Sequence, residues 1–425
     1  MPSKSFPKSV VIVGAGVFGL STALAIARRH PSTRITVVDR LVPPVADGEN
    51  YDDPVYTKLA TQAQRIIEND VDLSRHMYKQ GMTWVIDGRP GECTESWKKQ
   101  LEISKSLTPK DIIMCKTRGD VYQTIHGKSA QPPSAVDLGR EHDWNTAYTN
   151  MDNAFIDPKE CIQIYYDRCL KIPSIIIKCG VPVKRINTAD GKANGVALED
   201  GSSIEAEHVI VAAGSWSNKL VHLENLATTV SIAVAWIKVT PEEEAKWKNM
   251  SITTNLTTGL NLFPPYRGEI KVLRRLGGYI NTVTLPHPED ESKTIKTSYP
   301  RTPITNPTDV IPAEAEEQIR DNLREIMPMI ADRPFDRTRL CWRSHTPTKD
   351  FLIAPHPRIA NLQVATGGSG HGFKFLPIIG DLIVDSVDGT LAPELKAKWA
   401  FRDHKGPARD VGKPKEVRDL IRSRI

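Results

Sequence analysis

A glycine-rich motif near the start of the chain constrains the fold more than any other feature. The apolar run Val10–Val13 leads into Gly14-Ala15-Gly16-Val17-Phe18-Gly19, and a second apolar run, Arg34–Val38, ends at Asp39. This order is typical of a strand, a glycine turn, a helix, and a second strand that ends in an acidic residue. The motif therefore predicts a site for an adenine dinucleotide.

Each residue type in the motif has a physical role at its position. Gly14 permits a tight turn, Gly16 lets backbone N–H groups approach a pyrophosphate, and Gly19 lets the helix lie close to the strand. Asp39 is placed to accept hydrogen bonds from a ribose diol. Two alternatives are a glycine turn in another α/β fold and a membrane span over 10–27. The glycines and hydroxyl residues of this window, and the lack of a second such segment, argue against the span.

Composition limits the class of protein. A chain of 425 residues exceeds what one core usually holds, so we expect two domains. Hydrophobic residues make up 40% and charged residues 25%, as in soluble globular proteins. The net charge of +5 comes from Lys and Arg interleaved with acids, which gives nucleic-acid binding little support. The six cysteines show no Cys-x-x-Cys spacing, which indicates no zinc site and suits a reducing compartment.

The rest of the chain alternates between strand and helix patterns. We predict a helix over Tyr51–Met82, a hairpin over Ala193–Gly201, and a buried strand from Ala206 that ends in a turn at Gly214. Residues 84–150 give a weak, mixed pattern. Between Leu226 and Asp332 the strands alternate more and prolines are frequent in the loops, which indicates a separate mixed sheet.

A second glycine turn lies near the C-terminal end. Leu362–Thr366 has the pattern of a strand, Gly367–Phe375 that of a glycine-rich turn, and Leu376–Val384 that of a helix. Pieces that suit a dinucleotide therefore occur at the start, in the middle and near the end of the chain. They predict a domain that is discontinuous in sequence.

These motifs together resemble the fungal sarcosine-oxidase-like branch of the D-amino-acid-oxidase superfamily, which includes fructosyl-amine (amadoriase), saccharopine and pipecolate oxidases. The most specific signal is Cys341-Trp342, then Thr346-Pro347 and Asp350–Ile353, and finally the Gly367–Phe375 turn. The resemblance implies a glutathione-reductase-like FAD domain and a sheet-based substrate domain. It also implies oxidation of a C–N bond to an imine, with hydride passed to the flavin and reoxidation by O2 to give H2O2.

The expected fold is thus α/β, with a discontinuous Rossmann-type FAD-binding domain and a second, mixed-sheet substrate domain. The FAD-binding domain is expected over 1–83, 151–224 and 333–425, and the substrate domain over 84–150 and 225–332.

The resemblance assigns a covalent link to Cys341. In the family, flavin is attached at this position through a thioether to the 8-methyl group of the ring. Thiolate attack needs a cysteine whose deprotonation is favoured, and Arg339 and Arg343 supply positive charge nearby in the sequence. The alternative is a buried thiol that does not react.

The resemblance also implies three catalytic residues. Lys271 matches a lysine that sits over the flavin and promotes reaction with O2, where a cation stabilises developing superoxide. Lys374 matches a lysine at the flavin N1/C2=O edge that also contacts a substrate carboxylate, and His371 matches a histidine near the ring. The alternatives are a solvated strand lysine for Lys271 and a capping or core imidazole for His371.

The predicted cofactor-binding residues extend the two glycine motifs. They are Val13, Gly14, Gly16, Val17, Phe18, Gly19, Asp39, Arg40, Val183, Gly214, Trp216, Cys341, Gly370, Gly372, Phe373 and Lys374. The expected partners are a small amine substrate and O2. We expect no metal, no nucleic acid, no membrane and a monomer.

The sequence departs from the family pattern at two places. Relatives carry a segment of the form Asp-x-x-Arg-Ile-Ile-Arg before the Tyr-x-Asp-Pro-x-Tyr helix, whereas here Asp47–Asn50 runs straight into Tyr51–Tyr56. Those arginines line the flavin and bind a substrate carboxylate in a bidentate way. Their loss fits a substrate without a carboxylate, impaired flavin binding, or a spliced or misassembled sequence. Arg343-Ser344-His345 also replaces an aromatic residue, a small residue and Asp.

The sequence therefore predicts an FAD-dependent oxidase of a secondary amine, an N-methyl amine or an amino-acid-derived compound. One alternative is a flavin-binding protein with little activity, because the arginines are missing, and a third is an NAD-dependent dehydrogenase. The final residues Ser423-Arg424-Ile425 resemble a peroxisomal signal, read by the import receptor as small, basic and aliphatic. We expect the peroxisome, with the cytoplasm as the alternative.

Overall fold

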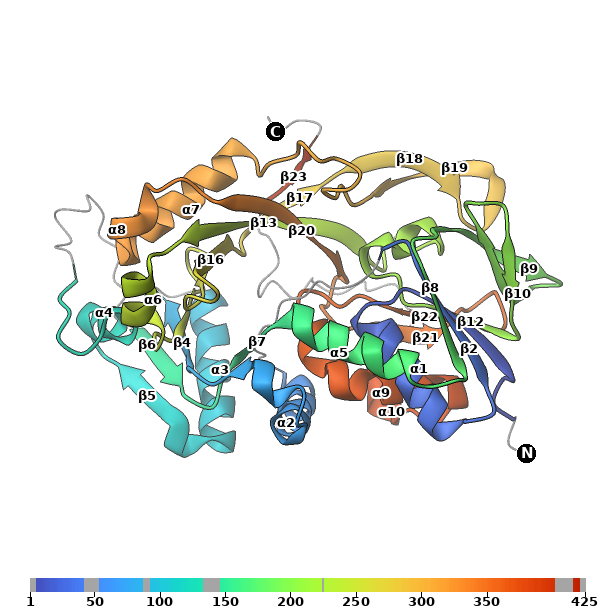
Figure 1. The fold of residues 1–425 in the computed structure, drawn as a ribbon, viewed down its shortest axis with the longest axis horizontal. Helices are drawn as coiled ribbons and strands as arrows, with labels where there is room; N and C mark the ends of the chain where they lie inside the picture. The colour runs from blue at the N-terminus through green and yellow to red at the C-terminus, as the bar shows by residue number, and fades with distance from the viewer. Residues whose placement is uncertain are drawn as a thin grey trace.

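The structure, a computed structural model, describes residues 5–41, 53–86, 92–132, 146–223, 225–401 and 416–420. In Figure 1 one sheet and its helices fill the right-hand side, and a larger sheet runs over the top towards the left. The segment 47–52 and the tail 423–425, which carry two sequence predictions, lie outside the described residues.

The first sheet has six strands within the described residues. In spatial order they are β21 (Leu352–Pro355), β22 (Leu362–Thr366), β12 (His208–Val211), β1 (Ser9–Val13), β2 (Arg34–Asp39) and β8 (Ile175–Cys179). All neighbouring pairs are parallel except β21 with β22. Because its strands come from the start, middle and end of the chain, the predicted discontinuous α/β sheet is confirmed.

Both faces of this sheet are buried. Alternate residues of β1, such as Val10 and Ile12, share an apolar core with α1 (Val17–Arg29), α5 (Pro158–Leu170) and α9 (Leu376–Asp388). The other face, with Val11 and Val13, packs on a three-stranded sheet. That sheet contains β9 (Val183–Ala189), β10 (Lys192–Leu198) and β11 (Ser203–Glu205), and the antiparallel pair β10–β11 is the predicted hairpin with shifted bounds.

The second sheet is larger. Its described strands are β23 (Glu416–Asp419), β17 (Gly277–Ile280), β13 (Thr228–Lys238), β16 (Glu269–Arg274), β15 (Leu260–Leu262), β14 (Ile252–Asn255), β4 (Met82–Ile86), β6 (Thr146–Asn150) and β5 (Ile112–Cys115), with β20 (Arg337–His345) paired to β13. The helices of this part are α3 (Glu92–Leu107), α4 (Arg118–His126), α6 (Pro241–Trp247), α7 (Ala313–Ile326) and α8 (Pro328–Ala331). The mixed sheet predicted from the prolines and the alternation is present.

Two small pieces connect the large sheets. A hairpin of β18 (Thr282–His287) and β19 (Asp290–Ser298) arches over the top right of Figure 1, and β3 (Met77–Tyr78) pairs with β7 (Phe155–Ile156). The described chain also contains α2 (Pro54–Asn69) and α10 (Pro393–Lys398).

The helix predicted over Tyr51–Met82 is shorter than expected. It begins after Asp53, whose side chain accepts the N–H of Val55, and ends at Asn69. The carboxylate of Asp70 then accepts the N–H groups of Asp72 and Leu73, which turns the chain out of the helix. A short helical turn, β3 and β4 fill the rest of the predicted range.

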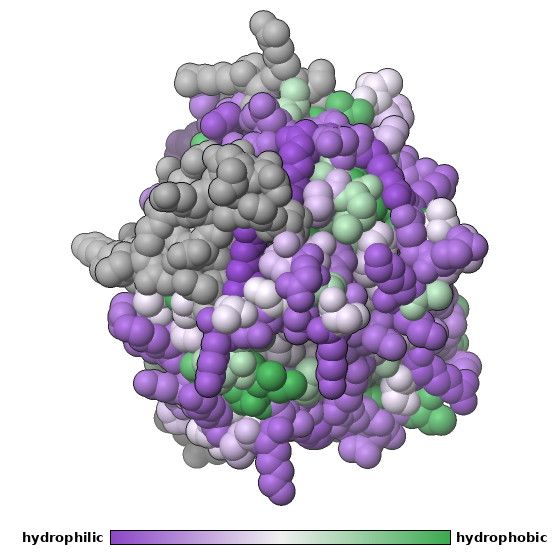
Figure 2. All heavy atoms as spheres, turned by 90° about the vertical axis from the view of Figure 1, so that its left-hand side faces the viewer, coloured by the Kyte–Doolittle hydropathy of each residue, from purple (hydrophilic) through white to green (hydrophobic). Residues whose placement is uncertain are grey.

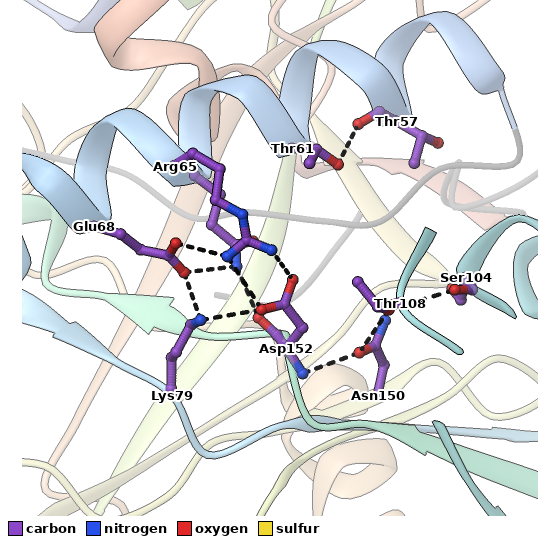
Figure 3. A network of polar contacts seen from close by, with 10 residues as sticks. Thr57, Thr61, Arg65, Glu68, Lys79, Ser104, Thr108, Asn150 and Asp152 are labelled. Atoms are coloured by element: carbon purple, nitrogen blue, oxygen red, sulfur yellow. Dashed lines mark hydrogen bonds and ion pairs between the residues drawn. The ribbon is translucent and has the colours of Figure 1, made fainter. Parts of the chain in front are cut away.

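A charged network holds α2 against the turns beside β3 and β7 (Figure 3). Arg65 pairs with Asp152 at 2.8 Å and with Glu68 at 2.6 Å, and Lys79 pairs with the same two carboxylates at 3.0 and 2.5 Å. Two cations and two acids thus neutralise one another. We assign this network to packing because its charges are balanced.

The predicted domain boundaries stay a prediction, but the pairing of β20 bears on them. Residues 337–345, expected in the FAD-binding domain, hydrogen-bond along 228–236 of the second sheet. This pairing carries Cys341 to the junction of the two sheets.

The surface is mainly polar on the face seen in Figure 2, where hydrophobic residues form small separate patches. On β5, Ile113 is 53% exposed and Met114 42%. None of the helices in the described part of the chain is long and apolar enough to cross a bilayer.

Candidate active site

A cavity of about 540 Å³ lies where the two sheets meet. One wall is made by Val13–Phe18, Val38–Leu41 and Ala212–Trp216, at the carboxyl ends of β1, β2 and β12. Arg339–Ser344 of β20 and residues 368–370 line it as well. Ligands of open parallel sheets bind at the carboxyl ends of the strands, so this cavity is the candidate site.

The first glycine motif has the geometry that the sequence predicts for a tight turn. Gly14 has φ +117°, and a Cβ there would lie 2.3 Å from the carbonyl oxygen of Ala212. A Cβ on Gly19 would lie 1.8 Å from the carbonyl oxygen of Gly14, so the helix packs against the turn as closely as glycine allows. Gly16, by contrast, has no atom within 4 Å of its Cβ position and lines the cavity.

Asp39 is held rigidly at the end of β2. Its carboxylate accepts the N–H of Ala15 at 2.7 Å and the N–H of Leu41 at 2.8 Å. Burial raises the pKa of Asp39, although these backbone hydrogen bonds oppose the shift. The carboxylate thus ties the second strand to the glycine turn at the wall of the cavity.

Arg40 and Trp216 form the next part of the wall. The Arg40 guanidinium lies 5.4 Å from the centroid of a Trp216 ring and donates to the hydroxyl of Tyr299 at 2.9 Å. The buried indole N–H of Trp216 has no hydrogen-bond acceptor among the described residues. A buried N–H without an acceptor at a cavity wall suits a polar ligand group.

Cys341 lies on β20, which pairs only with β13 within the described chain. The thiol is buried among Ile232, Val234 and Leu273. Arg339 and Arg343 are two residues away on either side, so their side chains leave the same face of the strand. All three residues line the cavity.

Positive charge predominates in the cavity lining. The cationic residues of the lining are Arg40, Lys219, Arg301, Arg339 and Arg343. Asp39 is the one acid among the described lining residues. Asp309 binds Arg301 through two contacts of 2.6 Å, and Glu199 binds Lys219 at 2.6 Å. Arg339 adds a guanidinium to the cavity wall two residues before Cys341 on β20.

Lys271 lies on the same face of the second sheet as Cys341 but does not line this cavity. Its ammonium is 4.8 Å from the centroid of the Phe263 ring. The structure therefore gives Lys271 an aromatic neighbour, and its role towards O2 stays a prediction.

Neighbouring residues of the second glycine turn differ in whether they line the cavity. Gly370 and Gly372 line the cavity, whereas His371 is 3% exposed and does not. The imidazole Nε2 is 2.8 Å from the carbonyl oxygen of Lys349, and the ring stacks on Phe351 with centroids 4.9 Å apart. This environment is typical of an imidazole that packs in the core, which is the alternative interpretation of His371.

Lys374 follows in a short helical turn, Gly372–Phe375, immediately before α9. It is half-buried and lies outside the cavity lining. Of the predicted cofactor-binding residues, only Gly19 and Lys374 are outside the lining, and Gly19 serves the helix contact described above.

Sequence reasoning missed one wall of the cavity. This wall is formed by the segment after β19, namely by Tyr299, Arg301, Thr302, Pro303 and Ile304. No glycine motif or strand-end acid marks this segment. Its place depends on the path of the β18–β19 hairpin, which local patterns do not encode.

The parallel sheet carries a dinucleotide-type glycine turn, and a strand of the second sheet that bears Cys341 closes the cavity beside it. This architecture defines the class of two-sheet, dinucleotide-binding proteins. The chain belongs to the family of FAD dependent oxidoreductases (DAO), whose model matches residues 9–386. The resemblance found in the sequence is confirmed. The NAD-dependent alternative does not fit this family.

Relatives and solved structures agree with that assignment. L-saccharopine oxidase of Schizosaccharomyces pombe is 27% identical over 411 residues, which cover 93% of each chain. Monomeric sarcosine oxidase of a Bacillus species is 24% identical over 88% of this chain and 90% of its own. The structure of fructosyl peptide oxidase from E. terrenum has a TM-score of 0.86 at 23% identity, covers 100% of this chain and 98% of its own, and shows the shared fold.

Proposed function

We propose that this chain is an FAD-dependent oxidase that converts a secondary amine, an N-methyl amine or an amino-acid-derived amine to an imine, with O2 reduced to H2O2. The family assignment and the oxidases named among its relatives support this function. The observation that carries it is the single cavity that joins the glycine motif of α1 to Cys341 on β20.

The residues present fit FAD. The open space at Gly16 leaves room for a pyrophosphate beside the N-terminus of α1, where backbone N–H groups and the helix dipole favour negative charge. Asp39 stands at the strand end that suits a ribose, and the unpaired indole N–H of Trp216 offers a donor. Bound FAD would supply the hydride acceptor and the reaction with O2.

We further propose that the cofactor is attached through the sulfur of Cys341. Arg339 and Arg343 leave the same strand face as Cys341, so two positive charges lie on the side of the sheet where the sulfur would meet the cofactor. The apolar neighbours Ile232, Val234 and Leu273 keep water away from the sulfur.

The proposed reaction does not require an acid–base pair of side chains. A neutral amine transfers hydride directly once it is held in the right orientation, so the protein contributes positioning and charge. Lys271, on the same sheet face as Cys341, is the cation that we assign to the oxygen step.

The purified protein tests this function directly. We expect an absorption spectrum typical of flavin, H2O2 on addition of at least one amine from a panel of N-alkyl amino acids and simple N-methyl amines, and yellow colour in the acid precipitate. Flavin without H2O2 for any amine would favour the alternative of a flavin-binding protein with little activity. Colour that passes entirely into the acid supernatant would contradict the Cys341 link.

A further inference from the structure

The β18–β19 hairpin is held in place by side chains instead of by a sheet. Its two strands pair with each other, and no other described strand hydrogen-bonds to them. An isolated two-stranded hairpin is marginally stable in water. Contacts with neighbouring segments therefore fix its position at the top right of Figure 1. Asn218 donates to the hydroxyl of Thr297 at 3.0 Å, and the rings of His222 and His287 lie 4.5 Å apart.

The base of the hairpin continues into the wall of the cavity. We call residues Tyr299–Ile304, which follow β19, the strap. The strap is tied down at Tyr299, whose hydroxyl accepts from Arg40 at 2.9 Å, and at Arg301, whose carbonyl oxygen accepts the indole N–H of Trp342 at 2.6 Å. Both anchors line the same cavity, so the strap closes over the proposed cofactor site.

The tip of the hairpin carries a buried carboxylate. Glu289 lies in the turn between β18 and β19, and its side chain is only 12% exposed. One carboxylate oxygen is 3.3 Å from Nε2 of His356 and accepts the backbone N–H of His222 at 3.1 Å. The other oxygen pairs with the guanidinium of Arg358. His356 and Arg358 lie between β21 and β22 of the first sheet, and His222 lies in the connection from β12 of that sheet to β13 of the second.

The tautomer of His356 follows from its hydrogen bonds. Nδ1 accepts the N–H groups of Arg358 at 3.3 Å and Ile359 at 3.0 Å, so it carries no proton in this arrangement. Nε2 therefore carries the proton, and this N–H donates a hydrogen bond to the carboxylate of Glu289. The imidazole is 1% exposed, so the loss of its partner would leave a buried donor unsatisfied.

We propose that Glu289 is a positioning residue that fastens the hairpin and thereby keeps the strap closed over the cofactor cavity. Loss of Glu289 removes the contacts of its buried carboxylate at the tip and leaves there the surface pair of Glu291 with Arg185 and the ring contact of His287 with His222. The strap then moves away from Arg40 and Trp342 more often. Glu289 thus controls how fast FAD leaves its site. This inference rests on the proposed placement of FAD in the cavity.

The test uses the full chain with Cys341→Ser, in which flavin release is reversible. We expect Glu289→Ala to raise the FAD dissociation rate at least tenfold and Glu289→Gln to have a smaller effect, since the amide oxygen still accepts from His356. The matched control is Glu291→Ala on the same hairpin. Glu291 is 77% exposed and pairs with Arg185 at the surface, so we expect its loss to change the FAD dissociation rate by less than twofold.

Hydrogen–deuterium exchange separates strap opening from general destabilisation. In flavin-free protein, Glu289→Ala should speed exchange at Tyr299 and Arg301 at least tenfold and leave β1 unchanged. Arg358→Ala, which removes a partner that is 65% exposed, should act in the same direction and does not threaten folding.

Unchanged FAD release and unchanged strap exchange would overturn the inference, as would equal acceleration throughout the chain. If the unmodified protein binds no FAD, the proposed function fails. The exchange measurement then decides alone whether Glu289 fastens the strap, so the two failures are distinguishable.

Discussion

Cys341 and Lys271 lie on the same face of the second sheet, with β13 between their strands. Cys341 is opposite Ile232 and Lys271 is opposite Trp236, and these two residues of β13 are four apart. Residues opposite each other share a face, and the face repeats every second residue. The two strands that carry them are about 10 Å apart. A flat cofactor attached at Cys341, as we propose, would thus lie on the lysine's side of the sheet.

This relationship leads to a prediction for Lys271. We expect Lys271→Met to slow reoxidation of reduced flavin by O2 at least tenfold, because loss of a preorganised cation costs a few kcal/mol of stabilisation. Reduction by the amine should change much less. Rapid mixing measures the two half-reactions separately, and equal losses in both would assign Lys271 a structural role.

Gly16 allows a sharper test of the cofactor site than Gly14. Because the Cβ position of Gly16 meets no atom within 4 Å, we expect Gly16→Val to fold and to lose most of its flavin. Gly16→Ala should lose less flavin than Gly16→Val. Flavin content comes from absorbance per protein chain, and full flavin content in the valine variant would remove the pyrophosphate from this position.

His371 distinguishes packing from catalysis. We expect His371→Phe to keep the stacking on Phe351 and to lose the hydrogen bond to the carbonyl oxygen of Lys349. Loss of one hydrogen bond costs about 0.5–1.5 kcal/mol, so the free energy of unfolding should fall by that amount. Turnover per bound flavin should stay within about threefold on the packing interpretation. A loss of 100-fold or more in kcat would restore the catalytic role.

The carboxylate of Glu289 predicts a pH dependence of stability. Burial acts to raise the pKa of Glu289, but hydrogen bonds from His356, Arg358 and the His222 N–H outweigh it and lower the pKa to about 2. A depressed folded-state pKa stabilises the fold above the ordinary value of 4.5, and this contribution is lost as the pH falls towards 2.

The difference in stability between the unmodified protein and Glu289→Gln should therefore shrink between pH 5 and pH 3. Denaturant unfolding at the two pH values measures it, with Glu291→Gln as the control. A difference that stays constant, or that grows on acidification, would contradict the assignment.

Local patterns were sufficient for the parts of the fold that are local. The alternation and glycine spacing of 10–19 predict β1, the turn and α1, since a tight turn and close helix packing depend on residues near in sequence. The second glycine turn and α9 followed in the same way. The helix over Tyr51–Met82 was too long because Asp70 turns the chain through side-chain bonds that hydrophobic spacing does not register.

Which residues meet in the cavity depends on pairing between strands that are far apart in the sequence. Cys341 reaches the cavity because β20 pairs with β13, more than a hundred residues earlier. Tyr299 reaches it because its backbone bonds Asn281 at the base of the hairpin and its hydroxyl accepts from Arg40. The motif marks His371 as a site residue, yet the aromatic rings around it come from distant segments.

The sequence by itself determined the dinucleotide motif, the discontinuous α/β sheet and the family, because these depend on residue types at fixed short spacings. Only the tertiary structure decided which charges face the cavity, that His371 packs in the core, and that the strap forms a wall. Those features depend on contacts between segments far apart in the chain. Their free energy comes from burial and pairing that exist only once both sheets have assembled.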